Sequence, residues 1–235
     1  MDPYLPRLVL LPGMDGTGLL LEDFARALPA ALRAEIVRYP PDDCGTYPEV
    51  DRFLRSAALD CEPFVLLAES FSTVAAIAWA ASAPPNLRGL VLCVGFATPP
   101  VPAWLRPIYS LLSHAYFALP RPDFILTHWL TGRDAPRELI ARVRELRGPA
   151  HTTAYPARIR AALACDVRAE LARVAVPIFI LAAQDDNLIG RARLDEMLRI
   201  RPDAEAHILP GPHLVLSRSP EQAAALVSAF TERCT

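Results

Sequence analysis

The chain has 235 residues, 52% of them hydrophobic and 21% charged, which suffices for a single domain with a full core. Its 24 basic residues, all of them arginine, nearly balance 26 acidic residues, so the net charge of −2 speaks against a nucleic-acid partner. The five cysteines lack metal-ligand spacing, no apolar run is long enough for a membrane span, and the first residues do not resemble a signal peptide. We therefore expect a cytoplasmic protein with no membrane span, metal or cofactor.

The first part of the chain alternates apolar runs with helical patterns. Strands are predicted at residues 8–11, 35–38, 64–67 and 90–94, and helices at residues 19–28, 48–60 and 74–81. The alternation resumes late in the chain, with strands at 177–183 and 206–209 and helices at 191–200 and 220–231. Short connections between alternating strands and helices favour parallel pairing. We predict an α/β fold with a mainly parallel sheet of about six strands, flanked by helices.

Between these two parts, residues 99–172 show no convincing strand and are predicted to form short helices interrupted by prolines. Residues 99–173 contain 11 arginines and 6 acidic residues, a balance of +5, whereas the rest of the chain has 13 against 20, or −7. We predict a core made of residues 1–98 and 173–235, with residues 99–172 as a helical insertion. The positive balance fits a solvated face or a surface for an acidic partner.

One stretch passes directly from a buried strand to a buried helix, with Ser70 at the bend. Residues 64–67 are apolar throughout, which is typical of a strand covered on both faces of a sheet. A serine at such a bend stands above the carboxyl edge of the sheet, next to the first N–H groups of the helix. The same serine could serve only as a helix N-cap, so this stretch alone does not decide its role.

A carboxylate and a histidine follow two other predicted strands. Asp186 comes after the strand at 177–183, and His213 comes after the strand at 206–209. Since the carboxyl ends of parallel strands share one edge, we expect both side chains near Ser70. Histidine can take the proton of an attacking serine, and a carboxylate can orient that histidine. Alternatively, Asp185 and Asp186 cap the next helix and His213 is an ordinary loop residue.

These motifs resemble those of the α/β-hydrolase superfamily over nearly the whole chain. The segment from Asp186 to Gly190 is similar to the family's Asp-x-Leu-Val-Pro pattern, which favours Asp186 over Asp185 as the acid. Gly211-Pro-His213 is similar to the family's Gly-His motif, with a proline inserted. The resemblance therefore implies a Ser70, Asp186 and His213 triad.

The same resemblance implies an oxyanion hole and a cap. Pro12-Gly13-Met14 is similar to the family's His-Gly-x loop, so the implied donors are the backbone N–H groups of Met14 and Phe71. Residues 99–172 fall where the family carries its cap or lid. Ala68 and Ser72 replace the glycines of the usual Gly-x-Ser-x-Gly elbow, and Pro12 replaces a histidine, but no departure removes a catalytic group.

The implied activity is that of a serine esterase that forms an acyl-enzyme. Aromatic residues of the cap are either its own small core or a substrate wall, and the second reading favours an apolar acyl group. The candidate wall residues are Trp104, Phe117, Phe124 and Trp129.

The expected substrate is a small-molecule ester. The chain is similar to esterases that cleave pimeloyl-carrier-protein methyl esters, so an acidic acyl carrier protein is a candidate partner, and Arg142, Arg144 and Arg147 are its candidate docking residues. The alternatives are an acyltransferase or a thioesterase that uses the same triad, or a binding module without catalysis.

Overall fold

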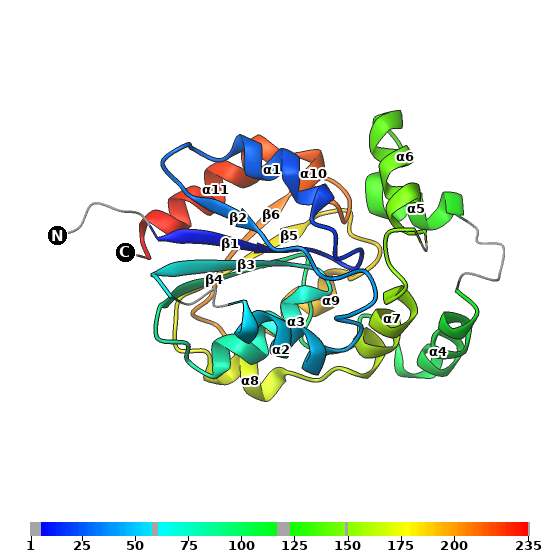
Figure 1. Ribbon diagram of the computed structural model, residues 1–235, viewed down its shortest axis with the longest axis horizontal. Helices are drawn as coiled ribbons and strands as arrows, with labels where there is room; N and C mark the ends of the chain where they lie inside the picture. Colours follow the sequence, from blue (N-terminus) through cyan, green and yellow to red (C-terminus); the bar gives the residue numbers. More distant parts are fainter. Residues whose placement is uncertain (1–5, 58–60, 117–122, 149, 235) are drawn as a thin grey trace.

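The computed structural model describes residues 6–57, 61–116, 123–148 and 150–234. Its centre is a six-stranded sheet in the order β2-β1-β3-β4-β5-β6, in which every neighbouring pair is parallel (Figure 1). The strands are β1 (Arg7–Leu11), β2 (Ala34–Ile36), β3 (Phe64–Glu69), β4 (Leu87–Cys93), β5 (Ile178–Ala183) and β6 (Glu205–Leu209). The predicted sheet of six parallel strands is confirmed.

Strand β3 lies inside the sheet and contributes to hydrophobic clusters on both faces. Phe64, Leu66 and Ala68 pack on one side, and Val65 and Leu67 pack on the other. All five side chains are fully buried. Successive side chains of a strand point to opposite faces, and here both faces are covered, so the strand reads as an unbroken apolar run.

Helices cover both faces of the sheet, as Figure 1 shows. One layer consists of α1 (Glu22–Ala27), α10 (Val215–Arg218) and α11 (Pro220–Glu232), and the other of α2 (Tyr47–Ser56), α3 (Ser72–Ala81), α8 (Arg168–Arg173) and α9 (Arg191–Ile200). The helix predicted at 19–28 is instead a 3₁₀ turn, η1 (Leu19–Leu21), followed by the short α1. It ends at Ala27 because Pro29 disfavours a helical Leu28, whose ψ is 147°.

The insertion after β4 is helical, as predicted. It contains η2 (Ala103–Leu105), α4 (Arg106–His114), α5 (Asp123–Thr131), α6 (Arg137–Leu146) and α7 (Tyr155–Ala164). In Figure 1, α4, α5 and α6 lie beyond the edge of the sheet. All but the last residue of helix α8 also falls within 99–172, but its Leu171 is fully buried in the hydrophobic cluster on one face of the sheet. The described ranges contain no helix that is both long and apolar enough to cross a membrane.

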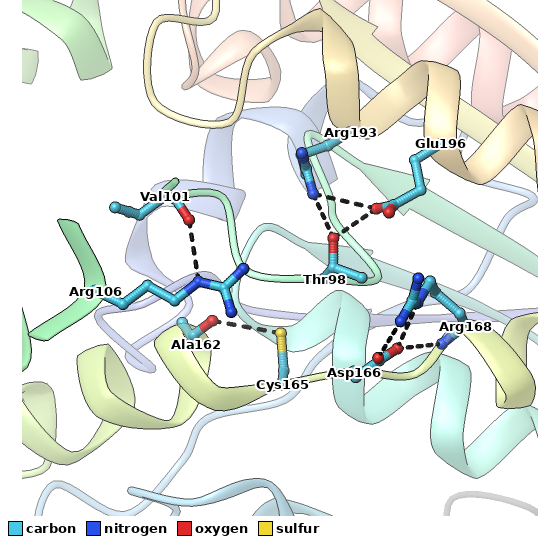
Figure 2. A network of polar contacts seen from close by, with 9 residues as sticks. All are labelled: Thr98, Val101, Arg106, Ala162, Cys165, Asp166, Arg168, Arg193 and Glu196. Carbon is cyan, nitrogen blue, oxygen red and sulfur yellow. Dashed lines mark hydrogen bonds and ion pairs between the residues drawn. The ribbon is translucent and has the colours of Figure 1, made fainter. Parts of the chain in front are cut away.

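Polar contacts fix the chain at both ends of the insertion, and Figure 2 shows those of Thr98, the last core residue before it. On the outgoing side, Thr98 donates a hydrogen bond to Glu196 of α9 over 2.6 Å and accepts one from Arg193. On the return side, the Val167 N–H donates to the Ala97 carbonyl over 2.9 Å. The two ends of the insertion are therefore fixed beside each other, at the carboxyl end of β4.

Candidate active site

Ser70 lies on a tight bend between β3 and α3. Its φ is +51°, a left-handed conformation that non-glycine residues seldom adopt. The bend is held because the Ser70 N–H donates to the Cys93 carbonyl over 2.9 Å, and the Thr73 hydroxyl donates to the Ser70 carbonyl over 2.6 Å. Backbone strain of this kind costs about 1–3 kcal/mol and persists only where the surroundings enforce it. The predicted elbow geometry is present.

His213 stands between Ser70 and Asp186. Its Nε2 lies 3.0 Å from Ser70 Oγ, and its Nδ1 lies 2.8 Å from Asp186 Oδ2. Because the Asp186 carboxylate can only accept, Nδ1 carries the proton and Nε2 is left to accept from the serine. The side chains of His213 and Asp186 are 3% and 7% exposed, so water is largely excluded from this pair. The three side chains predicted from the sequence are thus in hydrogen-bonding contact.

The second oxygen of Asp186 is held by the backbone. Its Oδ1 accepts N–H groups from Leu188 and Ile189, each over 2.9 Å. Burial raises the pKa of Asp186, but His213 and these two N–H groups outweigh it, and the net pKa is lowered. Burial lowers the pKa of His213, but Asp186 and Glu69 outweigh it, and the net pKa is raised. Asp186 therefore remains an anion beside an imidazole that readily accepts a proton.

Glu69 is a buried carboxylate directly before the serine. It is 1% exposed, and burial raises its pKa to about 7, with His213 and the Gly13 N–H acting in the opposite direction. Its Oε1 is buried without a hydrogen-bond partner in the described part of the chain. The carboxylate therefore interacts electrostatically with the histidine and accepts from the glycine-rich loop after β1 (residues 12–18).

The loop after β1 faces the bend and is held at several of its carbonyls. The Gly13 carbonyl accepts the Gly16 N–H over 3.2 Å, and the Gly16 carbonyl accepts the Tyr39 N–H over 2.8 Å. Within the described ranges, no acceptor is found for the N–H groups of Met14 and Phe71. Two such free donors beside a serine are what an oxyanion hole requires.

Ser72 explains why the elbow lacks its usual second glycine. Its hydroxyl donates to the Pro12 carbonyl and lies 2.7 Å from the Tyr39 hydroxyl. The side chain therefore joins α3 to the loop after β1 instead of merely filling space. Asp15 and Thr17 fix the turn of that loop, because Asp15 Oδ1 accepts from the Thr17 backbone N–H over 2.8 Å and from its hydroxyl.

The candidate substrate-wall residues lie in different surroundings. Trp104 on η2 is 74% exposed, so it does not line an enclosed pocket. Trp129 on α5 is 38% exposed and lines a cleft together with Pro212, next to His213. Phe117 and the side chain of Phe124 lie outside the described residues.

A second set of residues of the insertion lies close to the site. Leu214, next to His213, packs with Val143 and Leu146 of α6 and with Leu20 after the glycine-rich loop. Hydrophobic residues therefore bring α6 against the core on the side of the triad. The helical spacing of Leu139, Val143 and Leu146 indicates an apolar helix face, but it does not say what that face covers.

Two arginines of the insertion are buried, which the sequence did not predict. Arg147, predicted as a docking residue, is 3% exposed and donates to the Tyr116 hydroxyl, so it is not available to a partner. Arg158 of α7 was not singled out by any motif, yet it is fully buried and contacts the glycine-rich loop. Among the described residues, no group of three or more His, Cys, Asp or Glu side chains could hold a metal.

Comparisons with known proteins bear on the family and the fold of the chain. The sequence model of a family described as serine aminopeptidase, S33, matches residues 48–213, more than half of the chain. No curated protein sequence matches the chain.

Solved structures resemble the fold closely at low sequence identity. A lipase-esterase related protein from Clostridium acetobutylicum has a TM-score of 0.78 at 15% identity, covering 97% of this chain and 95% of its own. An enol-lactonase from Burkholderia xenovorans has a TM-score of 0.78 at 18% identity, covering 96% and 90%. A proline iminopeptidase from Mycobacterium smegmatis has a TM-score of 0.68 at 18% identity, covering 99% and 91%.

Proposed function

The chain belongs to the serine aminopeptidase S33 family of α/β-hydrolases and is a hydrolase by that membership, and we propose that it cleaves a carboxylic ester with Ser70 as its nucleophile. The observation that carries the proposal is the contact chain from Ser70 through His213 to Asp186, with spacings of 3.0 and 2.8 Å. This array gives the serine a base and gives the base a fixed tautomer.

The proposed reaction has two halves. Ser70 Oγ attacks the ester carbonyl while its proton passes to His213 Nε2, and the N–H groups of Met14 and Phe71 bind the oxyanion. His213 then gives this proton to the departing alkoxide, which leaves as the alcohol, and the acyl group stays on the serine. In the second half, water loses a proton to the same histidine and attacks the acyl-enzyme; His213 then returns the proton to Ser70 Oγ as the bond to the acyl group breaks and the acid is released.

The surroundings of the site favour an uncharged, apolar ester over a peptide. An aminopeptidase must bind a positively charged α-ammonium group, whereas residues 99–173 carry a balance of +5. The leucine-rich contact of α6 with Leu214 and Leu20 supplies an apolar flank beside the triad. We assign the cap to residues 99–172, with α8 packed on the core and α6 flanking the site.

Hydrolysis of p-nitrophenyl esters of increasing acyl length tests this proposal. Turnover by the natural protein and its loss in Ser70→Ala is the expected result. Retained turnover in that variant would show that another group does the chemistry. The same assay with an added alcohol acceptor, or with acyl thioesters as substrates, separates hydrolysis of oxygen esters from acyl transfer and from thioesterase activity.

A further inference from the structure

Arg158 has an unusual environment for an arginine. It lies on α7 within the insertion, and its side chain is fully buried. Its guanidinium lies over the rings of Tyr39 and Phe71. Burial lowers its pKa, but an arginine stays charged at any physiological pH. Burying an unpaired charge is costly, so a side chain in this position requires compensating contacts.

The hydrogen bonds of Arg158 all end on backbone carbonyls. In the described part of the chain, its Nε donates to Cys44 over 2.9 Å, its Nη1 to Met14 over 3.0 Å and its Nη2 to Asp43 over 3.2 Å. No carboxylate accepts from it there, although Asp15 is close enough to raise its pKa. The guanidinium therefore joins the loop after β1 to the loop before α2, and both to α7.

The loop is shaped to admit this side chain. Gly16 has a φ of +76°, and a Cβ placed on it would lie 2.3 Å from Arg158 Nη1. A glycine is required here both by the backbone conformation and by the close approach of the guanidinium. The fit between the loop and Arg158 is therefore specific and is not a chance surface contact.

The Met14 carbonyl belongs to the residue whose N–H is the proposed oxyanion donor. The peptide group that carries this N–H also carries the Gly13 carbonyl, which accepts from the Gly16 N–H. The following carbonyl, that of Met14, accepts from Arg158. Fixing both carbonyls fixes the backbone on either side of the donor, and an oxyanion hole works only when its donors are positioned in advance.

We infer that Arg158 is a positioning residue that aims the Met14 N–H at the oxyanion and thereby makes the active site depend on the docking of α7. This inference rests on the proposed function. It predicts that removing the guanidinium slows the chemical step and leaves the binding of uncharged substrate largely unaltered, because the donor acts mainly in the transition state.

The test uses Arg158→Met and Arg158→Lys, with Arg160→Met as the matched control. Arg160 lies on the same helix but donates to Ser113 of α4, away from the glycine-rich loop. The first measurement is the rate of Ser70 labelling by a fluorophosphonate, which needs no knowledge of the natural substrate. The second is kcat and KM on a p-nitrophenyl ester, with folding checked by circular dichroism and thermal unfolding.

For Arg158→Met we expect complete labelling at a rate lowered about 10²-fold, kcat lowered by a similar factor and KM within about threefold, as when one oxyanion donor is lost. Arg158→Lys retains one charged donor and should fall between Arg158→Met and the natural protein. If Arg158→Met does not fold, the reduced labelling rate of folded Arg158→Lys carries the test. A wild-type rate in either folded Arg158 variant, or an equal loss in Arg160→Met, would overturn the inference. Absence of labelling in the natural protein would overturn the proposed function itself.

Discussion

Replacing Asp186 by asparagine should reduce kcat/KM about 10⁴-fold while leaving the fold intact. The magnitude follows from the two roles of the carboxylate. Its Oδ2 accepts from His213 Nδ1 over 2.8 Å, and its Oδ1 accepts two backbone N–H groups from Leu188 and Ile189. An asparagine has only one acceptor oxygen and cannot fill both roles.

The backbone contacts decide which way the asparagine points. If its oxygen faces His213, the part-buried N–H groups of Leu188 and Ile189 lose their acceptor, at about 2 kcal/mol each and about 4 kcal/mol together. If its oxygen faces those N–H groups, its NH₂ donates to Nδ1 and the histidine proton moves to Nε2. Nε2 then cannot accept from Ser70. The difference of about 4 kcal/mol leaves roughly one molecule in 10³ with the active tautomer, since about 1.4 kcal/mol is a factor of ten.

The remaining factor of about ten comes from the imidazolium, which loses its anionic partner in the transition state. The total agrees with the loss of about 10⁴ known for the same change in a serine protease triad. The assay is kcat/KM on a p-nitrophenyl ester, with Asp185→Asn as the control because Asp185 is the exposed neighbour. An Asp186→Asn enzyme within tenfold of the natural one, or an equal loss in Asp185→Asn, would refute the reasoning.

Three further predictions concern the charge beside the triad, the elbow and the core. Glu69→Gln removes a negative charge that raises the pKa of His213, and the pKa of His213 should therefore fall. The acid limb of the kcat/KM profile should move to lower pH; an unmoved limb would contradict this coupling. Ser72→Ala removes the hydroxyl that donates to the Pro12 carbonyl and should lower the free energy of unfolding by about 1–3 kcal/mol in urea titration. The control, Ser56→Ala at an exposed position, should cost less than about 0.5 kcal/mol; similar values for the two would show that the bond from Ser72 to Pro12 contributes nothing. Leu66→Ala in the centre of β3 should cost about 2–5 kcal/mol by the same titration, and a cost below about 1 kcal/mol would mean that the strand is not packed on the face that Leu66 occupies.

The sequence predicts the core well because the core follows local rules. An apolar run such as 64–67 has few alternatives to a buried strand, and the parallel order follows from alternating strands and helices. The positions of Ser70, Asp186 and His213 follow in turn, since each comes just after the end of a strand. The topology places the three residues at one edge of the sheet, whereas the choice of Asp186 over Asp185 came from the resemblance of the motifs to α/β-hydrolases.

The features that the sequence did not reveal depend on contacts between distant segments. Arg158 lies 144 residues from Met14, whose carbonyl it binds, and no local pattern distinguishes it from Arg160, the partly exposed arginine of α7. The burial of Arg147 likewise depends on Tyr116 and on how the insertion folds. Glu69 follows an apolar strand, but only the tertiary structure shows that its carboxylate is enclosed against His213 and Gly13.

The central claim is that Ser70 is the nucleophile of an esterase, and the most direct measurement compares the natural protein with Ser70→Ala on p-nitrophenyl esters of increasing acyl length. We predict turnover that depends on acyl length in the natural protein and loss of at least about 10³-fold in the variant. Equal turnover by the two proteins, or no turnover by the natural protein together with no labelling of Ser70 by a fluorophosphonate, would contradict the claim.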